Sequence, residues 1–220
     1  MKKEELKEWG LTSYEKLRVS IEQGDKRKAV NLLNEIIKNR ESYRRWFMGM
    51  IDLLLTRLAD KAGEEEVHKL LRDLYHIRSV SGAGLFGDWT KLSAEEVVKS
   101  RARSWTASHA VPIQIEEDNE KFTLKISCPT GGGLRLKAEY GKTKKPHPWS
   151  HGEVGFCLYC THCITFFEMI AIEKFGYPIW GNDPVSKPEG TCMQYIYKDP
   201  KFVPEEVYKR VGKEKKAAKR

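Results

Sequence analysis

The stretch Cys157-Leu158-Tyr159-Cys160-Thr161-His162-Cys163 leads directly into a run of apolar residues at helical spacing that ends at Gly176. Thr161 has the side chain of a helix N-cap, and a glycine after the last helical residue is typical of a helix end. We therefore expect one helix over about 161–175, with the cysteines at its start. Segments on both sides alternate between apolar and polar residues, so this helix is expected to pack on a sheet.

The alternating segments predict a small antiparallel sheet. Asp118-Asn119 offers a turn between two alternating runs, which together form a hairpin. Leu134 and Leu136 predict a third strand, and a last strand is expected near the C-terminus. The apolar positions of the hairpin and of the last strand are Val111, Ile113, Ile115, Phe122, Leu124, Ile126, Met193, Tyr195 and Tyr197.

The residues before the hairpin predict a linker and a further helix. Three glycines lie between residues 79 and 92, which is typical of a linker. Ser93 and Glu96 then have the spacing of a capping box, which begins a helix. Residues 93–212 are accordingly predicted to form an α+β domain, an antiparallel sheet with packed helices, followed by a basic tail over 213–220.

The first third of the chain predicts a bundle of three or four antiparallel helices. Apolar residues recur at helical spacing through residues 1–78, and Gly24-Asp25 and Gly63 interrupt the series. We interpret the aromatic stripe in this part as core. The bundle is also expected to support a homodimer, because a short helical segment carries a large apolar load in Trp46, Phe47 and Met50.

Composition restricts the class of protein. The chain has 220 residues, a net charge of +8 and five cysteines, all after residue 127. An odd number of clustered cysteines favours a reducing compartment over a disulfide framework, and the mixed Lys/Glu N-terminus lacks a signal peptide pattern. We expect a cytoplasmic protein that does not bind membranes. Nucleic acid is a less favoured partner, because no recognition motif accompanies the basic charge.

Clustered thiols and imidazoles predict a zinc site. Two overlapping CxxC steps share Cys160, and two intervening residues let both sulfurs reach one ion. The preferred ligands are Cys128, Cys160, Cys163 and Cys192, with His151 or His147 in reserve. Cys157 alternates with Val154, Phe156 and Leu158, so a small buried strand residue is an equal alternative to ligation. An iron–sulfur cluster is the alternative cofactor, with Cys128-Pro129 as the distant fourth ligand.

The same segment also predicts thiol chemistry. Cys160 and Cys163 straddle the helix start, where the helix dipole is expected to stabilise a thiolate, and His162 is the candidate activating base. Glu168 is the second candidate catalytic residue, as a proton carrier beside a metal-bound water. The alternative for Glu168 is a surface carboxylate.

The order of features over residues 111–198 resembles the small-ligand domains of the 4-vinyl reductase and L-2-amino-thiazoline-4-carboxylic acid hydrolase type. The elements that carry the resemblance are Ser127-Cys128-Pro129, the helix end at Gly176-Tyr177-Pro178, Asn182-Asp183, and the strand from Gly190 to Tyr195. The Cys157, Cys160 and Cys163 run and the histidines before it are additions to that pattern. The resemblance implies a late cysteine that holds zinc or performs thiol chemistry, and a small, often aromatic ligand.

Three functions follow as hypotheses. The leading hypothesis is a zinc-binding protein with a pocket for a small anionic or aromatic molecule, acting as a metal- or thiol-dependent hydrolase-like enzyme or as a sensor. The second is a zinc-stabilised module that binds nucleic acid or protein. The third is an iron–sulfur or thiol redox protein that uses Cys160 or Cys163.

Overall fold

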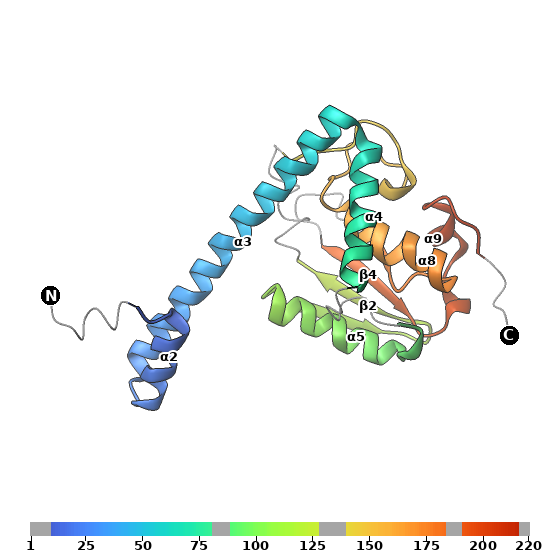
Figure 1. Ribbon diagram of the computed structural model, residues 1–220. Helices are drawn as coiled ribbons and strands as arrows, with labels where there is room; N and C mark the ends of the chain where they lie inside the picture. The colour runs from blue at the N-terminus through green and yellow to red at the C-terminus, as the bar shows by residue number, and fades with distance from the viewer. Residues whose placement is uncertain (1–9, 81–88, 128–139, 184–190, 216–220) are drawn as a thin grey trace. The chain divides into compact units, whose positions relative to one another are not determined.

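The computed structural model describes residues 10–80, 89–127, 140–183 and 191–215 (Figure 1). Contacts within the chain divide it into two compact units, Met1–Met50 and Ile51–Arg220. The cysteine segment lies in the second unit. The third strand predicted from Leu134 and Leu136, most of the linker predicted for residues 79–92 and most of the tail predicted for 213–220 lie outside the described residues.

The first unit contains helix α2 (Ser13–Glu22) and the N-terminal part of helix α3 (Lys26–Ala62). Thr12 and Glu15 form a capping box at the start of α2. Gly24 follows α2 with a φ of +73°, a backbone conformation that glycine adopts at little cost. The predicted break at Gly24-Asp25 is therefore confirmed.

The aromatic residues of α3 in the first unit lie on its surface. Tyr43 contacts Trp46 and Phe47, with ring centroids 6.1 and 6.2 Å apart. Trp46 is 63% exposed and Phe47 is 40% exposed. The interpretation of these side chains as core of the single chain is therefore wrong, whereas the homodimer that would cover them stays a prediction.

The helices of the second unit begin with the C-terminal part of α3, which ends at Ala62 as the sequence predicts. Gly63 has a φ of +98°, and helix α4 (Glu64–Val80) follows it. Val67, Leu71 and Tyr75 of α4 are buried in the main hydrophobic core. Residues 51–78 of the segment predicted as a helical bundle thus belong to the second unit.

Within the described residues, the sheet has four antiparallel strands in the order β1-β2-β4-β3. These strands are β1 (Ile113–Glu117), β2 (Lys121–Ile126), β3 (Gly181–Asp183) and β4 (Cys192–Tyr197). Asp118 turns the β1–β2 hairpin by accepting the backbone amides of Glu120 and Lys121. The predicted hairpin and last strand are confirmed, and β3 was not predicted.

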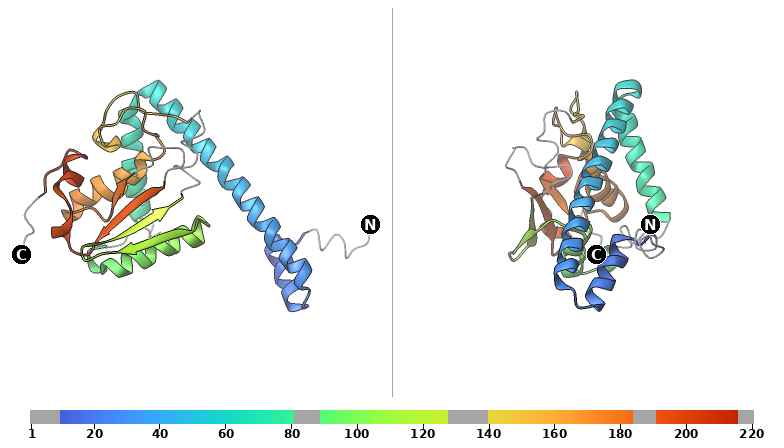
Figure 2. Two further views of the ribbon diagram at one scale, coloured as in Figure 1. Left: turned by 180° about the vertical axis from the view of Figure 1, so that it is seen from behind. Right: turned by 90° about the vertical axis from the view of Figure 1, so that its left-hand side faces the viewer.

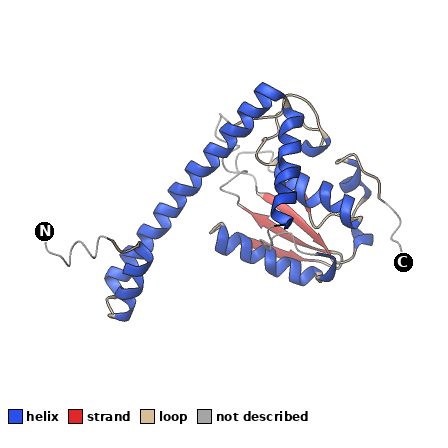
Figure 3. Cartoon of the chain, viewed as in Figure 1, coloured by secondary structure: helices blue, strands red, loops and turns tan. Residues whose placement is uncertain are grey.

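Helices cover one face of this sheet, which gives the predicted α+β class (Figures 1, 2 and 3). Helix α5 (Ala94–Arg103) begins at the predicted capping box of Ser93 and Glu96. The second helical run is continuous through α7 (Thr161–Ile164), the π-helical turn η4 (Thr165–Met169) and α8 (Ile170–Phe175). The core side chains of the covered face are Phe122, Leu124, Ile126, Gln194 and Ile196.

Short elements complete the second unit. They are the π-helical turn η2 (Ser104–Ser108), the 3-10 turns η1 (Trp89–Lys91), η3 (Pro148–Ser150) and η5 (Pro200–Phe202), and helix α9 (Glu205–Lys209). In the part of the chain that the structure describes, no helix combines the length and the apolar character needed to cross a membrane.

Candidate functional site

Residues 157–160 form a turn that carries Cys157 and Cys160, which we call the cysteine turn. Backbone hydrogen bonds between residues 141–143 and 155–158 hold this turn in place. Gly141 accepts the Leu158 amide at 2.9 Å, and Lys142 forms an isolated β-bridge with Cys157. Phe156, Cys157 and Leu158 are each 1% exposed, whereas Val154 is 61% exposed. The buried position considered for Cys157 is therefore confirmed, whereas the predicted alternation is wrong, because three consecutive side chains are buried.

Cys157 and Cys160 form a thiol pair and neither is in a disulfide. The Cys157 sulfur accepts a hydrogen bond from the Cys160 thiol and from the backbone amides of Cys160 and Tyr159. The bond from the Cys160 thiol is the main reason that the pKa of Cys157 is lowered, and burial opposes it. The pair thus favours one thiolate, on Cys157.

The pKa of Cys160 shifts in the opposite direction. Donation to Cys157, burial, and the neighbouring sulfurs of Cys157, Cys163 and Cys192 raise it well above the ordinary thiol value. Cys160 occupies the N-cap position of α7, but its thiol does not cap the helix. This direction is opposite to the thiolate stabilisation predicted for Cys160 at the helix start.

Cys163 forms a thiol–imidazole pair with the preceding residue. Its Sγ lies 3.4 Å from Nε2 of His162, and Nδ1 of the same ring lies 2.5 Å from the Tyr159 carbonyl oxygen. A carbonyl only accepts, so Nδ1 must carry the proton, and Nε2 of the neutral ring is then an acceptor for the Cys163 thiol. The hydrogen bond to the Tyr159 carbonyl therefore fixes the tautomer of His162 that can accept a proton from Cys163.

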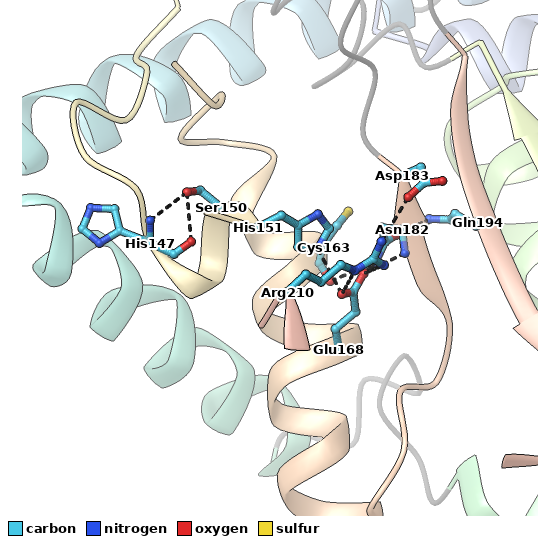
Figure 4. A network of polar contacts seen from close by, with 9 residues as sticks. All are labelled: His147, Ser150, His151, Cys163, Glu168, Asn182, Asp183, Gln194 and Arg210. Atoms are coloured by element: carbon cyan, nitrogen blue, oxygen red, sulfur yellow. Dashed lines mark hydrogen bonds and ion pairs between the residues drawn. The ribbon is translucent and has the colours of Figure 1, made fainter. Parts of the chain in front are cut away.

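Glu168 lies one helical turn further on and is completely buried. Its carboxylate accepts from Nε2 of His151 at 3.0 Å, from the Asn182 amide at 2.7 Å and from Nη2 of Arg210 at 3.0 Å (Figure 4). The surface carboxylate considered for Glu168 is wrong. Because both oxygens are occupied by donors, Glu168 is suited to holding three segments together.

The polar network extends from Glu168 across the covered face of the sheet. Asn182 also donates to Glu168 through its side chain at 3.0 Å and accepts from Gln194 at 3.3 Å. Gln194 in turn accepts from Nε of Arg101 at 2.8 Å. The guanidinium of Arg101 lies over the ring of Trp180, 4.6 Å from its centroid. These contacts connect α5, β3, β4 and the cysteine helix through buried groups.

The predicted metal ligands are partly described. Cys128 lies outside the described residues, and Cys192 begins β4 opposite Ile126. In the described ranges, no three His, Cys, Asp or Glu side chains form a group that could hold a metal ion. His151, the reserve ligand, uses its Nε2 toward Glu168. The zinc and iron–sulfur hypotheses stay predictions.

His147, the other reserve ligand, lies in the loop before the cysteine turn and contacts two glutamates at the start of α4. Its Nε2 lies 2.6 Å from Glu64, and its Nδ1 lies 3.1 Å from Glu65. The Lys144 backbone amide also donates to Glu64, at 2.5 Å. Burial alone would raise the pKa of Glu64, but the hydrogen bonds from Lys144 and His147 lower it overall.

This contact predicts a loss of stability in acid. The pKa of Glu64 is lower in the folded protein than its ordinary value of 4.5. Glu64 therefore stabilises the fold at any pH above 4.5, and this stabilisation is lost as the pH falls through the folded-state pKa. At pH 7 we expect Glu64→Gln to reduce the free energy of unfolding by about 1–3 kcal/mol, because two donors lose a charged acceptor. Denaturant unfolding from pH 7 to pH 3 should show this difference shrinking. Glu66→Gln, at a neighbour whose side chain is 41% exposed, is the control, and an equal loss in both variants would contradict the assignment.

A small hollow of about 80 Å³ lies at the opposite end of β4 from Cys192. Its walls come from η1, α5, the segment before β3 and η5, and include Trp89, Val97, Ile179, Ile196 and Tyr197. The hollow does not include the thiols. The small-molecule ligand expected from the sequence therefore stays a prediction.

Sequence reasoning missed three functional candidates. Asp52, Asn182 and Arg210 are each separated from their partners by at least 14 residues. The burial of Asp52 could have been inferred from its position three residues before Leu55, because residues at this spacing share a face of a helix and Leu55 is buried in the core. Nothing local in the sequence pairs Arg210 with Glu168, because that contact joins the C-terminal segment to the cysteine helix.

Comparison with known proteins gives no relative: the chain matches no family model, and no curated protein or solved structure is significantly similar to it. The resemblance to the 4-vinyl reductase type of domain therefore stays a prediction.

Proposed function

We propose that the protein carries out thiol–disulfide exchange, with Cys160 and Cys163 as its reactive pair. The contact of Cys163 with Nε2 of His162, in a ring whose other nitrogen is occupied by the Tyr159 carbonyl, carries the proposal. It supplies a base beside a partly exposed thiol, in a CxxC step at a helix start. Cys160 supplies the second thiol three residues earlier.

The first step uses the thiol–imidazole pair. His162 takes the proton from Cys163, and the resulting thiolate attacks one sulfur of an external disulfide. A bond forms between Cys163 and that sulfur, and the other half of the disulfide leaves as a thiolate. The protonated His162 returns its proton to the leaving group. Cys163 is a suitable nucleophile because its side chain is not fully buried.

The second step uses the Cys157–Cys160 pair. Cys160 attacks Sγ of Cys163, which forms the Cys160–Cys163 disulfide and releases the second external thiolate. The proton of Cys160 leaves along its hydrogen bond to Cys157 and is finally taken up by the released thiolate. Two protein thiols lose two electrons in all, and the external disulfide is reduced to two thiols.

The test is a reaction of the reduced protein with glutathione disulfide. We expect two equivalents of glutathione to be released per chain, and peptide mapping to find a Cys160–Cys163 linkage. His162→Asn should slow the first release at least about tenfold, because the base is lost. Absence of release, or a disulfide confined to Cys157 and Cys160, would overturn the proposal.

A thiolate zinc site is the second candidate. The observation that favours it is the pair of thiols at Cys157 and Cys160, one buried and one half-buried, because a CxxC step supplies two soft ligands. The amides of Tyr159 and Cys160 that point at the Cys157 sulfur are also the arrangement expected of a CxxC metal turn. Bound zinc would occupy these thiols and suppress exchange with glutathione disulfide, so the two candidates give opposite results.

A further inference from the structure

The first unit exposes most of its apolar side chains to solvent. Of its described residues 10–50, only Ser20 and Met48 are buried. Single exposed apolar residues are common on protein surfaces, but a contiguous apolar patch marks an interaction site. The exposed large apolar side chains of this unit are Tyr14, Ile21, Val30, Leu33, Ile37, Tyr43, Trp46, Phe47 and Met50.

Four of these side chains form one face of α3, which we call the apolar patch. They are Tyr43, Trp46, Phe47 and Met50. Their spacing of i, i+3, i+4 and i+7 places them within about 100° of the helix circumference. The Tyr43 ring contacts both Trp46 and Phe47. No charged residue of positions 43–50 lies within this arc, and the buried Met48 lies on the opposite side of the helix.

Helix α2 is too short to cover the apolar patch. It has 10 residues, so it is about 15 Å long, and it lies beside the N-terminal end of α3 (Figures 1 and 2). Helix α3 begins at Lys26, and Tyr43 lies about 25 Å further along it. The patch therefore lies beyond the reach of the other described helix of this unit.

The apolar patch has the size that a dimer interface needs. The exposed fractions are 65% for Tyr43, 63% for Trp46, 40% for Phe47 and 37% for Met50. With about 200 Å² for a large side chain, the patch presents roughly 400 Å² of apolar surface, as much as the largest patch on a typical monomer. Interfaces are only about 60% apolar, so this corresponds to roughly 700 Å² per chain. Two chains would bury roughly 1,400 Å², within the range of about 1,200–2,000 Å² for stable, specific interfaces.

A second copy of the chain is the partner that these features favour. Small units with little core are stabilised by disulfides, a metal or oligomerisation. Residues 1–50 contain no cysteine and no histidine, so this unit has neither a disulfide nor a thiolate or imidazole metal site of its own. The spacing of the patch is also that with which one helix packs on another, and a two-fold axis places the patch against itself.

We propose that the apolar patch forms the interface of a two-fold symmetric homodimer. The patch of one chain packs on the same patch of the other, and Trp46, near the middle of the patch, is its main anchor. Apolar contact holds the dimer together. The cysteines take no part in it, so the dimer does not depend on the proposed thiol–disulfide exchange.

Sedimentation equilibrium of the full-length protein in reducing buffer tests the proposal. Concentrations from about 1 to 100 μM are suitable, because interfaces of this size have dissociation constants in the micromolar range or below. We expect a monomer–dimer equilibrium. Trp46→Ala should raise the dissociation constant at least about 30-fold, since both chains lose a central aromatic anchor. Tyr14→Ala, at a 68% exposed aromatic residue of α2 outside the patch, is the matched control and should change it less than about threefold.

Thermal unfolding gives a second readout that a misfolded variant cannot imitate. The wild type should unfold at higher temperature as its concentration rises, because dimerisation stabilises the folded state by mass action. Trp46→Ala should still unfold cooperatively, because the second unit has its own core, but without this concentration dependence. A wild type that stays monomeric at the highest concentration, a dimer that Trp46→Ala leaves unchanged, or a monomer that binds anionic lipid vesicles through Trp46 would overturn the proposal.

Discussion

Replacing Cys163 with serine is expected to lower the rate of reaction with glutathione disulfide at least about 100-fold, because the attacking sulfur is lost. The thiol–imidazole contact, with Sγ 3.4 Å from Nε2 of His162, is the reason that we propose Cys163 as the nucleophile. Cys160→Ser should keep the first step and accumulate glutathione on Cys163, since the resolving thiol is absent. Intact-mass measurement at timed intervals distinguishes the two variants.

Cys192→Ser is the control for Cys163→Ser. Cys192 is a partly exposed residue of β4, and it also contributes to the raised pKa of Cys160. We expect its loss to change the rate of the first step less than about threefold, because the His162 contact remains. If Cys163→Ser reacts as fast as the wild type, or if glutathione accumulates on Cys157, the order of attack is wrong.

Replacing Glu168 with alanine is expected to lower the free energy of unfolding by about 3–5 kcal/mol. The carboxylate is 0% exposed and accepts from His151, Asn182 and Arg210. Its removal leaves the Arg210 guanidinium, 16% exposed, without its buried counter-charge. Urea unfolding monitored by tryptophan fluorescence measures the loss.

Glu173→Ala is the matched control for Glu168→Ala. Glu173 lies on the same helical run and pairs with Arg72 and Lys213, but its side chain is 31% exposed. Solvent screens this pair, so we expect a cost of about 0–1 kcal/mol. A Glu168 variant that unfolds within about 1 kcal/mol of the wild type would contradict the role given to the network.

Local signals predicted most of the secondary structure. Gly24, Gly63 and Gly176 each adopt a positive φ at the helix boundary expected from the sequence. The capping box of Ser93 and Glu96 and the Asp118 turn also form as their spacing predicts. These features depend on residues within a few positions of one another, so the sequence contains the information directly.

Contacts between distant segments could not be predicted in the same way. Strand β3 consists of Gly181, Asn182 and Asp183, three residues of low β-propensity. It is a strand because it pairs with β4, and this pairing cannot be read from the local sequence. The burial of Glu168 depends on Arg210, 42 residues away. The sequence predicted a strand position for Cys157 because the residues around it alternate between apolar and polar. Its environment is instead determined by the β-bridge to Lys142 and by the Cys160 thiol.

A metal analysis with thiol counting, on protein purified without chelators, distinguishes a free thiol exchange centre from a zinc site. We predict less than about a tenth of an equivalent of zinc per chain, and Cys163 as the first thiol alkylated in the folded protein. About one zinc per chain, with the clustered cysteines protected until a chelator removes the metal, would contradict a free exchange centre and establish the zinc site instead.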